Sequence, residues 1–378
     1  MIYLDNAATS WPKPESVAKA VYDCIRESGG NPGRSGHKMS LEAGRIVLDC
    51  RDAAAGLFGI DDPMRVIFTS NTTDGLNMAI KGILQPGGHA VTSSMEHNSV
   101  ARPLKALEPQ GIETTFVEAD RLGRIDPEDI ERAIRPNTSL IVLTLASNVT
   151  GTIQPFRGVG AIAKRHGIPF LLDAAQGAGH ISIDVKADNI DLMAFPGHKG
   201  LLGPQGTGGL YVGDGITLNT IKEGGTGSFS DLITQPDILP DRFESGTLNT
   251  PGLAGLAAGI GYIKSVGIEN IRGHEIDACG RIIGGLGEIG RVKLYGPADP
   301  EAHAGAIAFN VDGMDSTEVS YLLDSEYDIE VRAGLHCAGL AHKTIGTFEQ
   351  GAVRVSAGPF TTEEEIGVFL DAVKKIAR

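Results

Sequence analysis

The sequence predicts an α/β fold, in which a large domain surrounds a seven-stranded, mostly parallel, doubly wound sheet and a smaller α+β domain follows. Over roughly 200 residues, short apolar strand patterns alternate with helical patterns, which is typical of βαβ units. Glycine contributes 51 of the 378 residues without a repeating period, and this indicates many tight connections between strands and helices. A chain of this length can bury the large core that such a sheet needs.

The strands are predicted where runs of apolar and β-branched residues end in a polar or glycine-rich turn. In chain order they cover residues 65–70, 88–93, 114–118, 139–146, 169–173, 191–195 and 209–212. Helices are expected between them, and a loop rich in Asn, Pro, Gly and Ser is expected at 31–37. The helices cover residues 15–28, 40–58 with Ser40 as its N-cap, 74–81, 127–134 and 156–166.

A long helical stretch from about Leu253 leads into the smaller C-terminal domain. Strands of that domain are expected near residues 305–310 and 329–332. The pattern places the boundary between the two domains near residue 255.

Lys199 stands between a histidine and a run of glycines, directly after the strand predicted at 191–195. A lysine in a pocket loses hydration, so its pKa falls and its neutral amine can condense with a carbonyl group. Asp173 ends the preceding strand, with Gln176 three residues later. A lysine and a carboxylate at one edge of a sheet are what pyridoxal phosphate needs, one for the imine and one for the ring nitrogen. The alternatives are a surface lysine and a capping aspartate.

Further polar residues follow predicted strands at their carboxyl ends, which is where open α/β sheets bind ligands. Thr72 and Thr73 head a helix, where free N–H groups attract an anion, although they could serve only as caps. His97 could stack on a planar ring, and Asn148 could be no more than a turn residue. The candidates expected on one edge are Thr72, His97, Asn148, Asp173 and Lys199.

The four cysteines form no CxxC pair, which favours a reducing compartment and argues against disulfides and a zinc site. Cys24, Cys50 and Cys279 share helical faces with apolar residues and are expected in the core. Cys337 lies in the glycine-bounded segment 332–339, where nearby Arg and His side chains favour a thiolate over a structural thiol.

The segments Asp173-Ala-Ala-Gln176, Gly197-His-Lys199 and Arg332-Ala-Gly-Leu-His-Cys337 resemble the class V aminotransferase family, in particular its cysteine desulfurase and selenocysteine lyase branch. The resemblance covers nearly the whole chain. It implies a fold-type I enzyme that uses pyridoxal 5'-phosphate, with no metal, and it adds the N-terminal segment to the small domain. The large domain is then 15–255, and the small domain is 1–14 with 256–378.

The resemblance also implies roles for individual residues. Lys199 carries the cofactor, Asp173 faces its ring nitrogen and His97 stacks on its ring and transfers protons. Cys337 is the nucleophile, and Thr247 reaches across a homodimer to the partner's cofactor phosphate, unless it is an ordinary turn residue. The remaining assignments are Thr72, Thr73, Gln176 and His198 for the cofactor, Asn148 for the cofactor or substrate, and Ala7, Ala8, Arg332 and Arg354 for the substrate.

Arg354 lies on an expected strand, where its guanidinium could bind a substrate carboxylate with two hydrogen bonds or form an internal ion pair. Three features depart from the family pattern. Pro196 stands where relatives have a hydroxyl that binds the phosphate. Leu335 replaces a histidine, and Gly339-Leu340 replaces Gln-Pro.

The activity implied is that of a cysteine desulfurase, which converts L-cysteine to L-alanine with a persulfide on Cys337, or of a selenocysteine lyase. Another class V aminotransferase or epimerase acting on a small amino acid would have no use for Cys337. A non-catalytic sulfur-delivery scaffold is the third alternative. A protein that accepts sulfur or selenium is the expected partner.

The net charge of −14 argues against nucleic acid and anionic membrane as partners, because both require a basic face. The opening residues Met1-Ile-Tyr-Leu-Asp-Asn6 do not have the pattern of a signal peptide, and no apolar run reaches the roughly 18 residues of a membrane span. A cytoplasmic location is therefore expected.

Overall fold

In the computed structural model, the described residues are 1–33 and 36–378, so part of the loop predicted at 31–37 lies outside them. The strands are β1 (Ile2–Tyr3), β2 (Val66–Thr69), β3 (His89–Ser93), β4 (Glu113–Val117), β5 (Thr138–Thr144), β6 (Phe170–Asp173), β7 (Leu192–Pro196), β8 (Gly208–Val212), β9 (Val292–Tyr295), β10 (Ala306–Val311), β11 (Ile329–Glu330), β12 (Arg332–Gly334) and β13 (Ala352–Ser356). The helices are α1 (Glu15–Glu27), α2 (Lys38–Phe58), α3 (Thr72–Ile83), α4 (Asn98–Leu107), α5 (Pro127–Arg132), α6 (Phe156–His166), α7 (Thr250–Val266), α8 (Ile268–Gly287), α9 (Ser316–Tyr327), α10 (Gly339–Thr344) and α11 (Glu363–Ile376).

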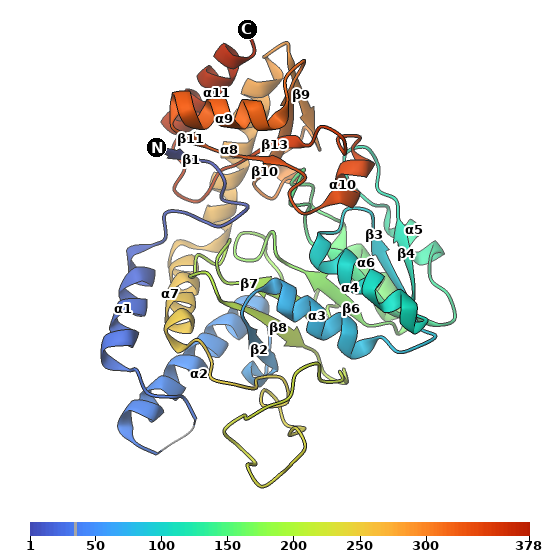
Figure 1. Cartoon of the computed structure of the whole chain (residues 1–378), viewed down its shortest axis with the longest axis vertical. Helices are drawn as coiled ribbons and strands as arrows, with labels where there is room; N and C mark the ends of the chain where they lie inside the picture. The colour runs from blue at the N-terminus through green and yellow to red at the C-terminus, as the bar shows by residue number, and fades with distance from the viewer. Residues whose placement is uncertain (34–35) are drawn as a thin grey trace.

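The larger sheet has seven strands in the order β2-β8-β7-β6-β5-β3-β4. Strands β7, β6, β5, β3 and β4 are parallel, whereas β8 runs antiparallel to both of its neighbours. The prediction of a mostly parallel, seven-stranded sheet is therefore confirmed. Because parallel strands end at one edge, the residues that follow β3, β5, β6 and β7 come together there (Figure 1).

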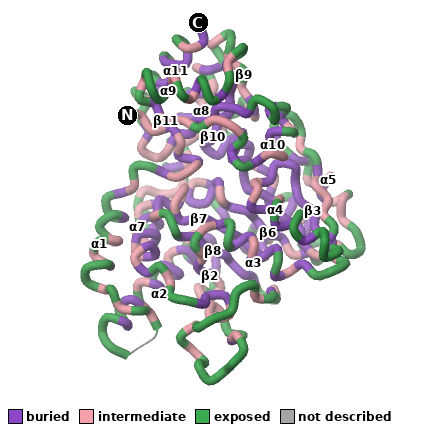
Figure 2. The backbone as a smooth tube through the Cα atoms, in the orientation of Figure 1, coloured by how far each residue is buried: buried purple, intermediate pink, exposed green. Residues whose placement is uncertain are grey.

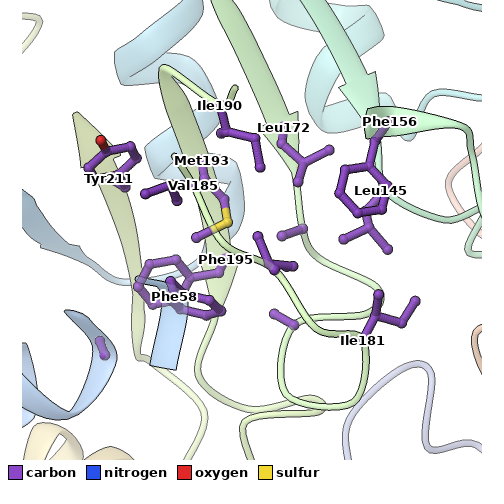
Figure 3. Packing of buried hydrophobic residues seen from close by; sticks show 14 of the residues in the cluster. Phe58, Leu145, Phe156, Leu172, Ile181, Val185, Ile190, Met193, Phe195 and Tyr211 are labelled. Carbon is purple, nitrogen blue, oxygen red and sulfur yellow. The ribbon is translucent and has the colours of Figure 1, made fainter. Parts of the chain in front are cut away.

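Both faces of this sheet are covered by helices, so successive residues of a strand enter two different cores. Phe170 and Leu172 of β6 pack in the cluster that contains residues of α2, α6 and α7, whereas Leu171 packs with α3 and α4. Figure 3 shows part of the first cluster, in which the Phe58 and Phe195 rings lie 5.1 Å apart between their centroids. Apart from the edge strand β4 and the first two residues of β5, the strands of the large sheet are almost entirely buried (Figure 2).

A second, antiparallel sheet of four strands has the order β12-β13-β10-β9. It packs against α8, α9 and α11 around a separate hydrophobic cluster, at the upper end of Figure 1. The N-terminal strand β1 pairs in parallel with β11 beside this sheet. The first residues of the chain thus join its last third, while the domain bounds 1–14, 15–255 and 256–378 stay a prediction.

The predicted starts of α1, α5 and α6 are confirmed, whereas α2, α3 and α7 begin two or three residues earlier than predicted because polar side chains cap them there. His37 caps α2, since its Nδ1 accepts the Ser40 N–H, so Ser40 is inside the helix and is not its cap. Asn71 caps α3, which begins at Thr72 and not at Asp74. The long helical stretch predicted from Leu253 begins at Thr250 and is broken at Gly267, where φ is 90°.

The cysteines are distributed as their neighbours indicated. Cys24, Cys50 and Cys279 are buried, whereas Cys337 is exposed. Among the described residues, no helix is long and apolar enough to cross a membrane. In the same residues, no group of three His, Cys, Asp or Glu side chains is placed to hold a metal ion.

A buried ion pair fastens α2 to the edge of the large sheet. Arg51 pairs with Glu244 and also donates to the Val66 carbonyl, and the two side chains are only 4% and 5% exposed.

Arg51→Met would leave a buried carboxylate without its cation, so we expect the free energy of unfolding to fall by about 3–5 kcal/mol. Denaturant unfolding measures the loss. Arg45→Met, which removes an exposed partner of Glu42, is the control, and equal effects of both variants would contradict the assignment.

Candidate active site

One cavity at the carboxyl edge of the large sheet gathers most of the predicted site residues. Eight of its lining residues were predicted from the sequence, and they come from the ends of β3, β5, β6 and β7 and from the start of α3. These are Thr72, Thr73, His97, Asn148, Asp173, Gln176, His198 and Lys199. Five separate parts of the chain thus place polar side chains around one space.

Lys199 is partly buried and lines this cavity as well as a second, smaller one. Burial lowers the pKa of its amine to about 8, and the positive charge of Arg354 acts in the same direction. The negative charge of Asp173 opposes the shift without cancelling it. The side chain is therefore suited to nucleophilic attack, which requires the neutral amine.

Asp173 ends β6 and is 1% exposed. Its Oδ1 accepts the Ala175 N–H at 2.9 Å. Burial raises the pKa of this carboxyl to about 6, while the positive charge of the nearby Lys199 acts in the opposite direction and lowers it. At neutral pH it remains a carboxylate that faces a cavity and can bind a protonated nitrogen.

A hydrogen-bonded chain crosses one side of the cavity from α3 to α4. The hydroxyls of Thr73 and Ser99 lie 2.7 Å apart, and the Ser99 N–H donates to His97 Nδ1 at 3.0 Å. Because Nδ1 accepts this bond, the neutral His97 ring carries its proton on Nε2. Burial, with a further contribution from the charge of Lys199, lowers the pKa of His97 to about 4, so the ring is neutral.

His198 has a buried Nδ1 with no hydrogen-bond partner among the described residues. Burial lowers its pKa to about 4. Its carbonyl accepts hydrogen bonds from Thr9 Oγ1 at 3.0 Å and Lys13 Nζ at 2.7 Å, and Ser10 Oγ donates to the Lys199 carbonyl at 2.8 Å. The N-terminal segment therefore holds the backbone of His198 and Lys199.

Gln176 and Ala7 connect the cavity to the N-terminal segment. The Gln176 side chain donates to the Ala7 carbonyl at 2.9 Å, and the Ala7 N–H donates to Ser356 Oγ at 2.9 Å. Both residues line the smaller cavity beside Lys199. Ala8 lines neither of these two cavities.

Arg354 lies on β13, is 1% exposed and forms an ion pair with Asp5. It also donates to the Asn148 carbonyl at 3.0 Å, while its buried Nε has no partner among the described residues. Arg332 is exposed and lies opposite Arg354 in the register of β12 and β13. Neither arginine lines the cavity around Lys199. The ion pair with Asp5 and the hydrogen bond to Asn148 show that Arg354 has a structural role inside the protein.

Cys337 and Thr247 also lie outside the cavity around Lys199. Cys337 is in the loop before α10, where its carbonyl accepts the Asn98 N–H at 2.8 Å. Thr247 lines a different cavity, together with Thr69 and Ser245, and its hydroxyl lies 3.4 Å from Asn31 Nδ2. Within one copy of the chain, Thr247 and Lys199 therefore line different cavities.

Several residues at the site escaped the sequence analysis. Ser99 and Thr144 line the cavity, and Lys13 and Asp5 support it from the N-terminal segment. Ser99 is two residues after His97, a signal that could have suggested a cap for the helix there. Lys13 and Asp5 act through contacts with residues far along the chain, and no local sequence pattern predicts these contacts.

Comparisons with known proteins identify the family of the chain. The family described as Aminotransferase class-V matches residues 2–369. The chain is 36% identical to a probable cysteine desulfurase of Methanothermobacter thermautotrophicus, over 100% of this chain and 94% of the relative. It is 32% identical to the cysteine desulfurase IscS of Methanosarcina thermophila, over 100% of this chain and 92% of the relative.

Solved structures show the same similarity. The apo structure of a cysteine desulfurase from Thermococcus onnurineus NA1 matches with a TM-score of 0.92 and 34% identity, over 100% of this chain and 94% of the other. The cysteine desulfurase CsdA from Escherichia coli matches with a TM-score of 0.86 and 28% identity, over 99% and 94%. With a family match along almost the entire sequence and neighbours of the same full-length fold, the protein belongs to the aminotransferase class V family, as its motifs predicted.

Proposed function

We propose that the protein is a pyridoxal 5'-phosphate-dependent cysteine desulfurase, which converts L-cysteine to L-alanine and keeps the sulfur as a persulfide on Cys337. Full-length similarity to proteins named cysteine desulfurase supports the reaction type. The observation that carries the proposal is one cavity lined by Lys199, Asp173 and His198. Selenocysteine is a second candidate substrate, because its selenium occupies the place of the sulfur.

The residues of the cavity fit this cofactor. The phosphate would bind the free N–H groups at the start of α3 and the hydroxyls of Thr72 and Thr73. His198 Nδ1, which is buried and has no partner in the described part of the chain, would supply a further contact, although Pro196 offers no hydroxyl there. Asp173 would accept the ring N–H, and Lys199 would hold the aldehyde carbon. When bound, the cofactor supplies an electron sink for the carbon skeleton of the amino acid.

The surrounding side chains would then bind the substrate and move its protons. Lys199, with its lowered pKa, takes a proton from the α-carbon and later returns one. Asn148, which lines the same cavity, would contact the substrate or the cofactor. The Nε of Arg354, which has no partner among the residues described, and the exposed guanidinium of Arg332 would bind the α-carboxylate, with Asp5 holding Arg354 in place.

Cys337 is the proposed acceptor of the sulfur. Its thiolate forms an S–S bond to the substrate sulfur as the bond from that sulfur to the β-carbon breaks, and the electron pair passes to the carbon skeleton. After protonation the skeleton leaves as alanine. The sum is L-cysteine plus a protein thiol giving L-alanine plus a protein persulfide, which a reducing thiol or an acceptor protein then discharges.

The proposal is tested by measuring alanine from cysteine and from selenocysteine in parallel, with excess thiol to release the sulfur. We expect alanine and sulfide in equal amounts. Stoichiometric keto acid would instead assign the protein to another class V aminotransferase activity. If the purified protein lacks absorbance at about 420 nm and binds no added cofactor, the result would support the alternative of a non-catalytic sulfur-delivery scaffold.

The pKa of Lys199 predicts how cofactor binding depends on pH. With a pKa of about 8, roughly 10% of the amine is neutral at pH 7 and half at pH 8. The rate at which apoprotein binds the cofactor covalently should therefore rise between pH 7 and 8 and level off above about pH 9. Stopped-flow absorbance between pH 7 and 10 measures it, and the same series with a simple primary amine corrects for titration of the cofactor. A rate that still climbs at pH 10 would contradict the lowered pKa.

A homodimer with shared active sites completes the proposal. The segment between β8 and α7 carries exposed apolar side chains, among them Phe229, Leu232 and Ile233, and it is largely green at the lower end of Figure 2. Exposed apolar side chains in one segment favour an interface. Thr247 lies near the end of this segment and would reach the partner's cofactor phosphate. Light scattering should give about twice the chain mass of 39.6 kDa, and a monomer that is fully active would refute shared sites.

A further inference from the structure

The segment that carries Cys337 has an unusual backbone. Gly334 is the last residue of β12, and His336 and Cys337 lie between β12 and α10. All three have positive φ values, of 100°, 49° and 55°. Glycine adopts this region freely, whereas residues with a side chain do so at a cost in free energy. Such a conformation persists only where the surroundings hold it, so the contacts of His336 and Cys337 need to be identified.

Two hydrogen bonds tie this backbone to the large domain. The Asn98 N–H donates to the Cys337 carbonyl at 2.8 Å, and Asn148 Nδ2 donates to the His336 carbonyl at 2.7 Å. Asn98 follows His97, and Asn148 lines the cavity around Lys199. The peptide groups on either side of the Cys337 Cα are thus held at the rim of the candidate active site.

The side chain of His336 is held by a chain of hydrogen bonds with one consistent placement of protons. Its Nε2 lies 3.3 Å from the Arg332 carbonyl, which can only accept, so Nε2 carries the proton and Nδ1 accepts. His342 Nε2, at 3.2 Å from this Nδ1, must then donate. His342 Nδ1 in turn accepts from the Thr347 hydroxyl at 2.7 Å.

The three side chains that these hydrogen bonds join are buried, with His336 5%, His342 0% and Thr347 1% exposed. Burial lowers the pKa of His336 to about 3 and that of His342 to about 4, and the charges of Arg354 and Arg332 add to the first shift. Both rings are therefore neutral. A proton on either ring would turn its accepting nitrogen into a donor and break one bond of the chain.

We propose that His342 is a positioning residue for Cys337, acting through His336 to hold the thiol segment in its left-handed conformation beside the cavity. His342 lines neither cavity at Lys199, so it acts only through the bonded neighbour. The inference rests on the proposed function, because the position of Cys337 affects catalysis only if its thiol is the nucleophile. A displaced nucleophile lowers the rate of the bond-forming step while substrate binding is retained.

The test compares two substitutions at His342 in the full-length protein loaded with cofactor. His342→Phe keeps a ring but removes both nitrogens, whereas His342→Gln keeps an N–H donor for His336 Nδ1. We expect kcat for alanine from cysteine to fall at least about 30-fold in the first variant and no more than about 5-fold in the second, with KM within about threefold in both. Lys343→Gln, at an exposed position of the same helix, is the control.

Two further measurements separate positioning from a general loss of structure. Hydrogen exchange of the segments around Asn98 and Ala338 should accelerate at least about tenfold in His342→Phe, in the apoprotein as well. The change in cofactor absorbance on adding L-alanine, which has no sulfur, should equal that of the wild type. The proposal is overturned if His342→Phe exchanges and turns over like the wild type, if the Gln variant is equally impaired, or if the L-alanine response is lost too.

Thr347→Val provides a second route if His342→Phe does not fold. It removes the hydroxyl that donates to His342 Nδ1, so exchange around Ala338 should again accelerate, and wild-type exchange would overturn the proposal. The exchange measurements do not depend on the reaction. A desulfurase that works without Cys337 would therefore refute the proposed function, while the exchange result would still report on the thiol segment.

Discussion

Lys199→Ala should lower alanine formation from cysteine at least about 10³-fold, because it removes both the covalent attachment of the cofactor and the group that moves the α-proton. The lysine is placed for both tasks, since it lines the cavity with Asp173 and its pKa is lowered to about 8. The variant is also expected to lose covalent labelling after borohydride reduction. Mass spectrometry of the reduced protein measures the labelling, and a coupled alanine assay measures the rate.

Lys186→Ala is the matched control, since this lysine is exposed and pairs with Asp61 away from the cavity. It should label and turn over like the wild type. If Lys199→Ala kept a reducible cofactor bond at the same position of the chain, another amine would be the attachment site. The role assigned to Lys199 would then be wrong.

Cys337→Ala should abolish sulfide release from cysteine, by at least about 10³-fold, while the absorbance of the bound cofactor survives. The physical reason is that the alanine side chain cannot form the S–S bond that takes the sulfur from the substrate. Cys337 lies on the loop before α10 and does not line the cavity in which the cofactor would bind. Methylene blue detection of sulfide and the visible spectrum measure the two effects on one sample.

Cys24→Ala serves as the control for loss of a thiol, because Cys24 is a buried residue of α1. Its activity should match the wild type. Full desulfurase activity in Cys337→Ala would reject this cysteine as the nucleophile, whatever the state of the cofactor.

The sequence determined the part of the molecule that depends on local pattern. Strand-like runs and their polar ends predicted a mostly parallel sheet, and that topology brings the residues after β5, β6 and β7 to one edge. The sequence alone therefore predicts that Asn148, Asp173 and Lys199 lie close together, and all three line one cavity. Apolar neighbours likewise separated the buried thiols of Cys24, Cys50 and Cys279 from Cys337.

Only the tertiary structure decided which distant groups support that edge. Asp5 pairs with Arg354, and Lys13 binds the carbonyl of His198. His342 holds His336 through nitrogens whose roles follow from the Arg332 carbonyl. Periodicity and strand ends report contacts within a segment, whereas these bonds join segments whose approach depends on how the whole chain packs. The sequence thus located the chemistry, and the packing of remote segments decided how its groups are held.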